Sequence, residues 1–388
     1  MRVIVVTPAV PHPFGDSSAR WFYVLITELL ARGNEVVVVA ATEESAARVA
    51  EAKQWLNKQA GRLTLHCHRL QMDSFALRRK WCSLVRPRSE LLQDRTLAML
   101  LQRELARGYD VLHLEQMSTG WLGLGKRRAL LNLLSLDSLD WAARPRPSLY
   151  DRHTLWQAER ATHHLLREID NIRVLSSRLK EAAESIHPMG RYWIVPLALD
   201  TSLYELQPPV DDLRVGLTGS MHWEPSRSAA ERLLTRIWPI IKKLIPRAKL
   251  YIAGWNATKY LGQFIPQADV TLADNIRHPS EFFSKVGVLL YAPVRGSGMK
   301  VKVMESMAYG VPVVTTWEGV EGMSYKDGYH CWVAESDEAL ARRACRLLEN
   351  PAERKDMRAA ARQLIEDRYS PRPVVDQMTA VYEELVSA

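Results

Sequence analysis

Several features that define common protein classes are missing from this sequence of 388 residues. Its four cysteines form no C-x-x-C pair and show no zinc spacing, which indicates unpaired thiols and a reducing compartment. The first apolar run, Val3–Thr7, is far too short to span a membrane, and no small-residue cleavage site follows it. We therefore expect a cytoplasmic protein.

Two familiar nucleotide-binding loops are also missing. The run Val3–Thr7 is followed by Pro8-Ala-Val-Pro-His-Pro13, and not by the G-x-G-x-x-G loop that a dehydrogenase requires. The chain has no G-x-x-x-x-G-K-[ST] motif, which excludes a P-loop NTPase. It also shows no repeat at a fixed period, which argues against solenoids and propellers.

Positive charge, by contrast, is in excess. The 52 Lys and Arg residues outnumber the 44 Asp and Glu residues, so the formal net charge is +8. Such an excess bears on binding partners and not on the fold. Nucleic acid, anionic lipid and phosphorylated small molecules are all compatible with it, and so is a basic surface that is simply solvated.

Short β-branched runs alternate with amphipathic helical stretches along the chain. The first unit has a strand at Val3–Thr7, a helix at Ala19–Arg32 and a strand at Glu35–Ala41, which is a βαβ unit with a right-handed crossover. Further strands are expected at Leu63–Leu70, Val111–Leu114, Leu130–Leu136, Asn171–Leu175, Ile194–Pro196, Arg214–Thr218, Lys249–Ala253, Val286–Tyr291 and Val313–Thr316. Further helices are expected at Leu91–Arg107, Leu155–Glu168, Ala229–Leu244, Val301–Tyr309, Glu338–Glu349 and Ala352–Glu366.

The alternation pauses in a proline-bearing connection near residues 196–210 and then restarts. This predicts an α/β protein with two Rossmann-like, doubly wound domains that face a cleft. We expect the first domain over 1–198, the second over 199–369, and a C-terminal helix over 370–388 that returns to the first domain. Ligands of such domains bind at the carboxyl ends of the parallel strands.

The most informative stretch is the loop Arg295-Gly-Ser-Gly298 and the helix that follows it. Gly296 and Gly298 let the backbone approach a ligand closely, with Ser297 between them. The start of the helix offers unpaired N–H groups to an anion. The stretch is therefore a candidate phosphate site.

Lys300 and Lys302 fall at the same helix start, where cations oppose the helix dipole by roughly 0.3–1 kcal/mol each. Their position is explained if a diphosphate occupies the pocket. Glu305 lies one turn from Lys302 and could accept both hydroxyls of a ribose. The alternative is an exposed Lys–Glu pair on a solvated helix.

This stretch resembles the C-terminal motif of family 4 glycosyltransferases, in which a glutamate, seven residues and a second glutamate precede a Gly-x-Pro-Val-Val strand. Glu305 matches the second glutamate, which binds the ribose of the nucleotide sugar in that family. Ser297 stands in place of the first, which normally touches the donor sugar. A subgroup with a Gly-Gly-Gly-Thr-Arg-Leu-Lys-type loop shows the same departure, which therefore puts sugar contacts in doubt more than nucleotide binding.

Other segments of the chain resemble this family too. The segment Leu217–Pro225 is similar to its first phosphate-facing loop, which implies that backbone N–H groups of Gly219 and Ser220 reach the diphosphate. The alternative for Gly219 is a tight turn. The resemblance also implies that the nucleobase lies near Asn275 and Ile276, mainly against their backbone.

In the first domain, Gly15 matches the first glycine of the family's Gly-Gly pair and Asp16 replaces the second. The resemblance implies a loop that closes over the diphosphate. The alternative is an ordinary turn in which Asp16 or Ser17 caps the following helix. The strand end Asp110–Glu115 resembles the family's Asp-Val-(Val/Leu)-His-x-His. There, Glu115 replaces the second histidine and is expected to contact a sugar, while His113 is equally compatible with a core histidine.

Acidic residues also follow the strand at Leu130–Leu136. Asp137, Ser138 and Asp140 are expected at the cleft edge, without an assigned role. The segment 75–88 is basic and contains aromatic and aliphatic residues. It is compatible with peripheral contact at the inner face of a membrane or with an ordinary basic helix.

The resemblance implies the GT-B fold and a hexosyltransferase of carbohydrate biosynthesis that moves a sugar from a nucleotide-diphosphate donor to a hydroxyl, with retention of configuration. Because no D-x-D motif appears in a matching loop, we expect no metal and no cofactor besides the donor. Lys300, Lys302 and Arg295 would stabilise the departing diphosphate. The acceptor could be a glycan, a lipid-linked sugar, a protein or a small molecule, and no nucleic-acid partner is expected. A non-catalytic sugar-nucleotide binder and a sugar-nucleotide epimerase of the same fold are the alternatives.

Overall fold

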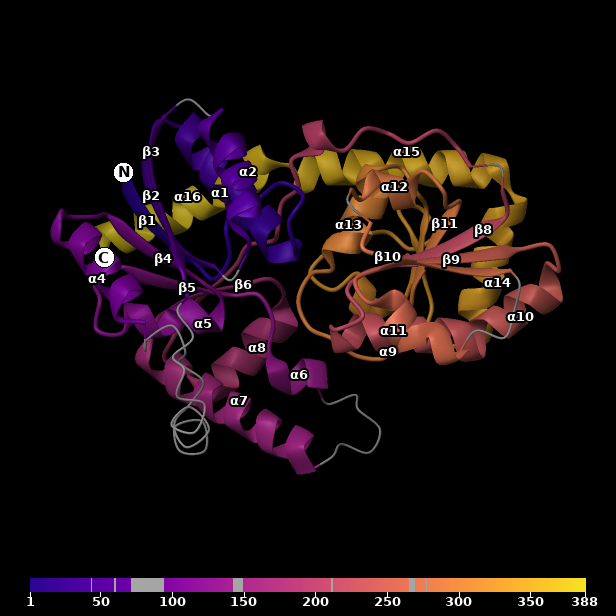
Figure 1. The fold of residues 1–388 in the computed structure, drawn as a ribbon, viewed down its shortest axis with the longest axis horizontal. Coiled ribbons are helices and arrows are strands. Elements are labelled where there is room, and N and C mark those ends of the chain that lie inside the picture. Colours follow the sequence, from indigo (N-terminus) through magenta and orange to yellow (C-terminus); the bar gives the residue numbers. More distant parts are fainter. Residues whose placement is uncertain are drawn as a thin grey trace. The chain divides into compact units, whose positions relative to one another are not determined.

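The computed structural model divides into two compact units, which are described separately (Figure 1). The first unit comprises residues 1–138, 144–198 and 371–388, and the second comprises 139–143 and 199–370. The structure describes residues 1–42, 44–58, 61–70, 94–141, 149–210, 212–264, 269–276 and 278–388. The predicted basic segment at 75–88 lies outside these residues.

A parallel sheet of seven strands forms the centre of the first unit, in the order β3-β2-β1-β4-β5-β6-β7. The order reverses direction between β1 and β4, which is the arrangement of a doubly wound fold. Its strands are β1 (Arg2–Thr7), β2 (Glu35–Thr42), β3 (Arg62–Arg69), β4 (Val111–Glu115), β5 (Ala129–Leu133), β6 (Asn171–Val174) and β7 (Arg191–Ile194).

Helices connect these strands. They are α1 (Ser17–Ala31), α2 (Ala46–Asn57), α4 (Arg95–Ala106), α5 (Gln116–Gly120), α6 (Asp137–Trp141), α7 (Leu149–Glu168) and α8 (Ser177–Ile186). The last helix of the chain, α16 (Pro371–Ser387), packs against α1 and β4. An ion pair of 2.7 Å between Arg32 Nη1 and Asp376 Oδ1 joins α16 to the end of α1.

The second unit contains a parallel sheet of six strands in the order β10-β9-β8-β11-β12-β13. These are β8 (Arg214–Thr218), β9 (Lys249–Gly254), β10 (Val270–Asp274), β11 (Val288–Tyr291), β12 (Val313–Thr315) and β13 (Trp332–Val333). Its helices are α9 (Glu224–Arg232), α10 (Trp238–Leu244), α11 (Ala257–Leu261), α12 (Ser280–Phe283), α13 (Val301–Ala308), α14 (Asp337–Glu349) and α15 (Pro351–Arg368).

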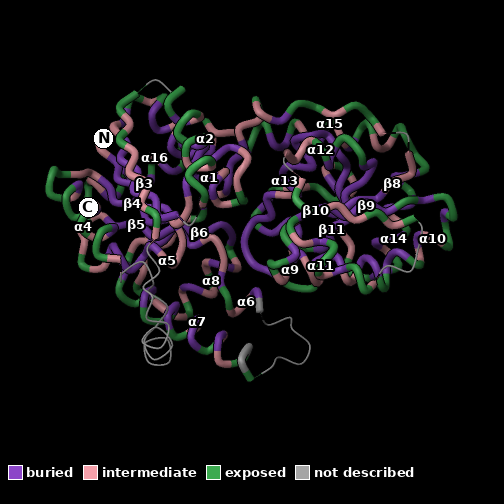
Figure 2. Tube along the Cα trace, in the orientation of Figure 1, coloured by how far each residue is buried: buried purple, intermediate pink, exposed green. Residues whose placement is uncertain are grey.

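The cores of the two units follow from the sequence pattern. The central strands β1, β2 and β11 are apolar runs whose residues are nearly all buried, and β4 is fully buried too, as expected when helices cover both faces of a parallel sheet (Figure 2). Helix α1 is buried on nearly all sides, because every residue from Trp21 to Ile26 is buried, as are Leu29 and Leu30. The helix ends at Gly33, whose φ of 77° suits glycine and not a side chain with a Cβ.

Sequence patterns misplaced several boundaries. The helix expected at Ala229–Leu244 is α9 and α10 with a π-turn at Leu233–Ile237 between them. Pro239 explains the interruption, because it lacks the N–H group that a continuous helix would use. The strand expected at Ile194–Pro196 is instead β7 at Arg191–Ile194, which ends two residues before Pro196. Strand β10 and helices α2 and α8 were not anticipated.

No helix in the described part of the chain is both long and apolar enough to cross a bilayer.

Helix α16 is held to the first unit by a buried hydrogen bond. The Tyr382 hydroxyl lies 2.7 Å from His113 Nδ1 on β4, and both side chains are fully buried. We expect Tyr382→Phe to lower the free energy of unfolding by about 1–3 kcal/mol, because a buried polar atom loses its partner. Urea denaturation measures the loss. Glu383→Gln, on the exposed side of the same helix, is the control, and equal stability of the two variants would contradict a role for the bond.

Candidate functional site

In the second unit, the loop after β11 leads directly into α13. Lys300 is the N-cap residue of α13 and has an extended backbone, while Lys302 lies in the first turn. Gly298 has a φ of 70°, a conformation that glycine adopts without strain. The sequence prediction of a glycine loop opening a helix is therefore correct at this point.

Lys300 folds back onto its own loop. Its ammonium group donates hydrogen bonds to the carbonyl oxygens of Ser297, at 2.8 Å, and Gly298, at 2.5 Å. The side chain is buried, with 7% of its surface exposed. These contacts give Lys300 a role in shaping the loop, whereas its contact with a diphosphate stays a prediction.

Lys302 occupies a different environment, at the junction of several elements. Its Nζ lies 2.5 Å from Ser226 Oγ, on α9, and 4.4 Å from the centre of the Tyr291 ring, at the end of β11. Burial, and secondarily the nearby charge of Lys300, lower the pKa of Lys302 to about 7. The ammonium group is thus placed where water stabilises it poorly and where an anion would stabilise it well.

Gly219 closes this pocket from the side of β8. It has a φ of 151°, and a Cβ placed on it would lie only 2.4 Å from Lys302 Nζ. A side chain here would push the Lys302 ammonium group aside, and the positive φ favours glycine. Gly219, Ser226, Tyr291 and Lys302 together form what we call the lysine pocket.

Two members of the lysine pocket were not predicted from the sequence. Ser226 follows directly after the phosphate-loop segment that was recognised, and Tyr291 is the last residue of an apolar strand. A hydroxyl-bearing residue at the carboxyl end of a buried strand is the signal that could have indicated Tyr291. Burial raises the pKa of the Tyr291 hydroxyl above its ordinary value, so it stays protonated.

Glu305 lies one turn beyond Lys302 on α13 and is buried, with 4% of its surface exposed. Its negative charge acts on Lys302 and raises the pKa of that lysine, against the larger effect of burial. A solvated surface pair, the alternative considered for these two residues, does not describe a carboxylate with so little exposure. Ribose binding by Glu305 stays a prediction.

A carboxylate from elsewhere in the chain lies on the glycine loop. Asp140, in the short segment that groups with the second unit, accepts hydrogen bonds through Oδ1 from Ser297 N, at 2.6 Å, and Ser297 Oγ, at 2.9 Å. Both residues are buried. The sequence placed Asp140 in an acidic loop without a role, because its partner is 157 residues away.

The other predicted residues of this unit lie at the same edge of its sheet. Ser220 and Arg295 are exposed, in the loops after β8 and β11. Asn275 is exposed and Ile276 half-buried, just after β10, and Asn275 has a φ of 54°. Their contacts with a donor stay predictions.

In the first unit, the loop before α1 is ordered by its own hydrogen bonds. Asp16 caps the helix through Oδ1, which accepts from Ser18 N at 2.9 Å and Ala19 N at 2.8 Å. Arg20 Nε donates to the Gly15 carbonyl at 2.9 Å. The capping role considered for Asp16 is therefore present, and diphosphate contact by Gly15 and Asp16 stays a prediction.

Glu115, at the carboxyl end of β4, is fully buried in a polar network. Its Oε1 accepts hydrogen bonds at 2.8 Å from Trp21 Nε1 and interacts at 2.8 Å with His113 Nε2, and its Oε2 accepts one from Asn132. The sequence offered Glu115 as a sugar contact and left His113 open as a core residue. The structure gives both a place in the core, and the sugar contact stays a prediction.

Arg173 completes this network from β6. It donates to Asn132 Oδ1 at 2.8 Å and to the Val195 carbonyl at 3.0 Å, and its guanidinium lies 4.1 Å from the centre of the Trp21 ring. Burial lowers the pKa of Arg173 to about 10, which still leaves it charged at neutral pH. A charged residue inside an otherwise apolar strand was not singled out from the sequence.

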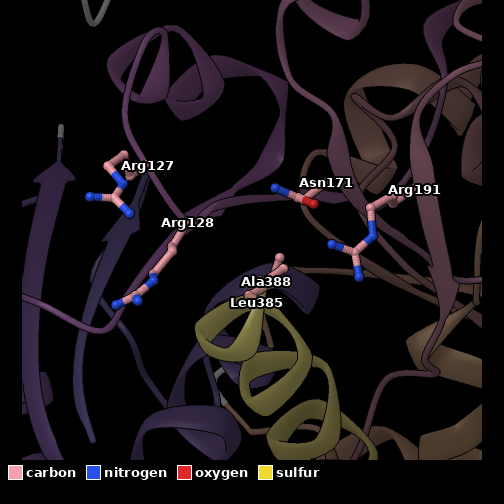
Figure 3. A pocket seen from close by; sticks show the side chains of 6 residues that line it. All are labelled: Arg127, Arg128, Asn171, Arg191, Leu385 and Ala388. Atoms are coloured by element: carbon pink, nitrogen blue, oxygen red, sulfur yellow. The ribbon is translucent and has the colours of Figure 1, made fainter.

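A cavity of about 220 Å³ in the first unit is lined by Arg127, Arg128, Asn171, Arg191, Leu385 and Ala388 (Figure 3). Asn171 and Arg191 begin β6 and β7, so the cavity lies at the amino ends of these strands. Ligands of doubly wound sheets bind at the opposite, carboxyl edge, and none of the predicted site residues lines the cavity. Within the described ranges, no group of three or more His, Cys, Asp or Glu side chains could hold a metal ion.

Comparison with known proteins bears on the family and the fold. Residues 212–350, which contain the lysine pocket, match the family model of group 1 glycosyl transferases. The match covers less than half of the chain and, together with the GT-B fold, indicates a glycosyltransferase. The enzyme class and the two-domain α/β fold expected from the resemblance are thus confirmed. None of the curated proteins matches the sequence.

Solved structures match this glycosyltransferase over almost its whole length. Sucrose-phosphate synthase from Thermosynechococcus elongatus is 17% identical, with a TM-score of 0.70 and 100% of both chains covered. HepE from Anabaena, in complex with UDP and glucose, is 13% identical, with a TM-score of 0.67 and coverage of 98% of this chain and 99% of that one. At this level of identity the likeness shows the fold.

The two lysines of the glycosyltransferase should respond oppositely to substitution by methionine. Lys302→Met removes a poorly solvated charge, so we expect the unliganded protein to gain about 1–4 kcal/mol of stability at pH 6. The pKa of Lys302 is about 7 when folded and roughly 10.4 when unfolded. Below pH 7 the cost of burying the charge is present in full, and it diminishes as the pH rises toward 10.4, so the gain should shrink by pH 9.

Lys300→Met is the matched variant, because it removes hydrogen bonds to two loop carbonyls and should lower stability by about 1–3 kcal/mol. Urea denaturation at pH 6 and pH 9 measures both effects. Destabilisation of similar size by both substitutions would show that Lys302 is an ordinary structural lysine.

Proposed function

We propose that this glycosyltransferase transfers a hexosyl group from a nucleoside-diphosphate sugar to a hydroxyl acceptor, with retention of configuration and without a metal ion. The observation that supports this proposal most directly is the lysine pocket. It places the partly desolvated ammonium group of Lys302 beside Gly219, where no side chain covers the backbone. A diphosphate fits both features, since it needs a cation and close backbone approach.

The molecules bound in similar structures favour a particular donor and acceptor. HepE has been crystallised with UDP and with UDP-glucose, and a variant of S. aureus TarM with UDP and alpha-GlcNAc-glycerol. We therefore propose a UDP-sugar as the donor and a hydroxyl of a glycan or glycosylated molecule as the acceptor. We also propose a cytoplasmic location, where free thiols such as Cys331 and Cys345 stay reduced.

In the proposed reaction, the bond between the anomeric carbon and the diphosphate oxygen breaks as the acceptor oxygen forms a new bond on the same face of the sugar. The acceptor proton passes to an oxygen of the departing diphosphate. Negative charge on the diphosphate grows during this step, and Lys302 can stabilise it without a metal. The backbone near Gly219 and the start of α13 would supply further N–H donors.

The proposal predicts that Lys302 matters more for turnover than for binding. Because the charge it faces grows in the transition state, Lys302→Met should reduce kcat about 100–1000-fold and raise the donor KM by less. Release of UDP from UDP-sugars, with an oligosaccharide acceptor mixture, measures both constants. Lys355→Met, on the exposed side of α15, is the control. Near-normal kcat and KM in Lys302→Met would place the reaction elsewhere.

A second prediction concerns metal ions. If Lys302 and the backbone amides supply the charge stabilisation, transfer should proceed at an unchanged rate in excess EDTA. Assays before and after chelation, with magnesium or manganese added back, test this. Loss of turnover on chelation and its recovery with a divalent ion would contradict the metal-independent mechanism.

A further inference from the structure

Aromatic side chains gather at the carboxyl ends of β8 and β9, next to the lysine pocket. Trp255 directly follows the last residue of β9 and is 53% exposed, and Trp223, in the loop after β8, is 41% exposed. The His222 ring meets the Trp255 ring edge-on, with centroids 5.8 Å apart and an angle of 78°. Single exposed tryptophans are ordinary, but several exposed aromatic rings in the loops where ligands of such sheets bind indicate a ligand-binding surface.

The backbone beneath Trp255 is fastened to the phosphate-facing loop. Met221 N donates to the Trp255 carbonyl at 3.1 Å, and Gly219 N donates to the Ala253 carbonyl at 3.1 Å. A Cβ placed on Gly254 would lie 1.9 Å from the Gly219 carbonyl oxygen, so the two loops touch through their backbones. The exposed ring therefore stands on a rigid base, which lowers the entropy cost of binding to it.

One residue joins this surface to the lysine pocket. Gly219 contacts Gly254 on one side and borders Lys302 Nζ on the other. Adjacent strands are about 4.8 Å apart. The backbone of Trp255 is therefore separated from the Lys302 ammonium group by about two such spacings. A nucleoside diphosphate has only a ribose between its phosphates and its base. A ligand whose phosphates lie at Lys302 can therefore place its base at Trp255.

The order of the strands indicates on which side of the diphosphate the nucleoside lies and on which side the transferred sugar lies. The neighbours β10, β9, β8 and β11 are followed by Asn275, Trp255, Gly219 and the glycine loop, in that order. With the diphosphate between β8 and β11, one end of the donor extends over β9 toward β10. The transferred sugar then lies toward β11, where Ser297 and Lys300 shape the loop. Because the exposed Trp255 ring directly follows β9 and offers a flat face for a base, the end over β9 is the nucleoside.

We propose that the Trp255 ring is the platform on which the nucleobase of the donor stacks. This inference rests on the proposed function of the lysine pocket and adds a residue that sets donor affinity. The indole ring offers a flat, apolar face, and stacking on it tolerates different bases. The edge contact of His222, which is itself 3.3 Å from the Tyr260 hydroxyl through Nδ1, fixes the ring from the side.

Calorimetric titration of the full chain with UDP, and with inorganic pyrophosphate, tests the platform. Trp255→Ala should weaken UDP binding by about tenfold or more, as is typical when a ring is removed from beneath a base, and leave pyrophosphate binding unchanged. Trp255→Phe keeps an aromatic face and should stay within about threefold of wild type. Trp317→Ala is the control, since this ring is 44% exposed but follows β12, beyond β11.

Three results would overturn the inference. UDP affinity that is unchanged in Trp255→Ala but lost in Lys302→Met would leave the proposed function intact and remove the platform. An equal loss of UDP and pyrophosphate affinity would mean that Trp255 acts by shaping the lysine pocket. No binding of UDP, GDP or ADP by the wild-type protein would contradict the platform and the proposed function together.

Discussion

Parallel strand pairing is the constraint on which the rest of this structure depends. Every strand pair of both sheets is parallel, so each chain crossover returns to the same end of the sheet and all carboxyl ends meet at one edge. That edge collects residues that are distant in sequence. Gly219 follows β8 and Trp255 follows β9, while Tyr291 ends β11 and Lys302 lies in the helix after it; the parallel sheet makes them neighbours.

Placing the half-buried Lys302 at that edge is unfavourable for the unliganded fold. The pKa of Lys302 falls to about 7 because the pocket solvates its ammonium group poorly, and the contacts with Ser226 and the Tyr291 ring only partly offset this. Such a cost is typical of a functional site, where a group is kept ready for a charge that arrives with the substrate. Lys300, two residues away, stabilises its own loop instead.

The first unit shows the opposite use of buried polar groups. Glu115, His113, Asn132 and Arg173 satisfy one another, and the chain extends to Tyr382 on the last helix. A network in which each member has partners specifies one arrangement of β4, β5, β6 and α16. The resemblance directed attention to Glu115 as a sugar contact, but the partners that determine its environment come from four other segments.

Local patterns of period and turn residues were enough to predict the fold class and the glycine loop that opens α13, and the motif resemblance predicted the enzyme class. The sequence located Lys302 and Glu305 on one helix face but could not tell a solvated pair from a buried one. That depends on what packs against the helix. The packed fold alone shows that Ser226 and Tyr291 complete the lysine pocket, that Asp140 binds Ser297 across 157 residues, and that Gly254, next to Trp255, touches Gly219. The physical reason is that sheet order and packing bring these residues together, and neither is encoded in the spacing of residues along the chain.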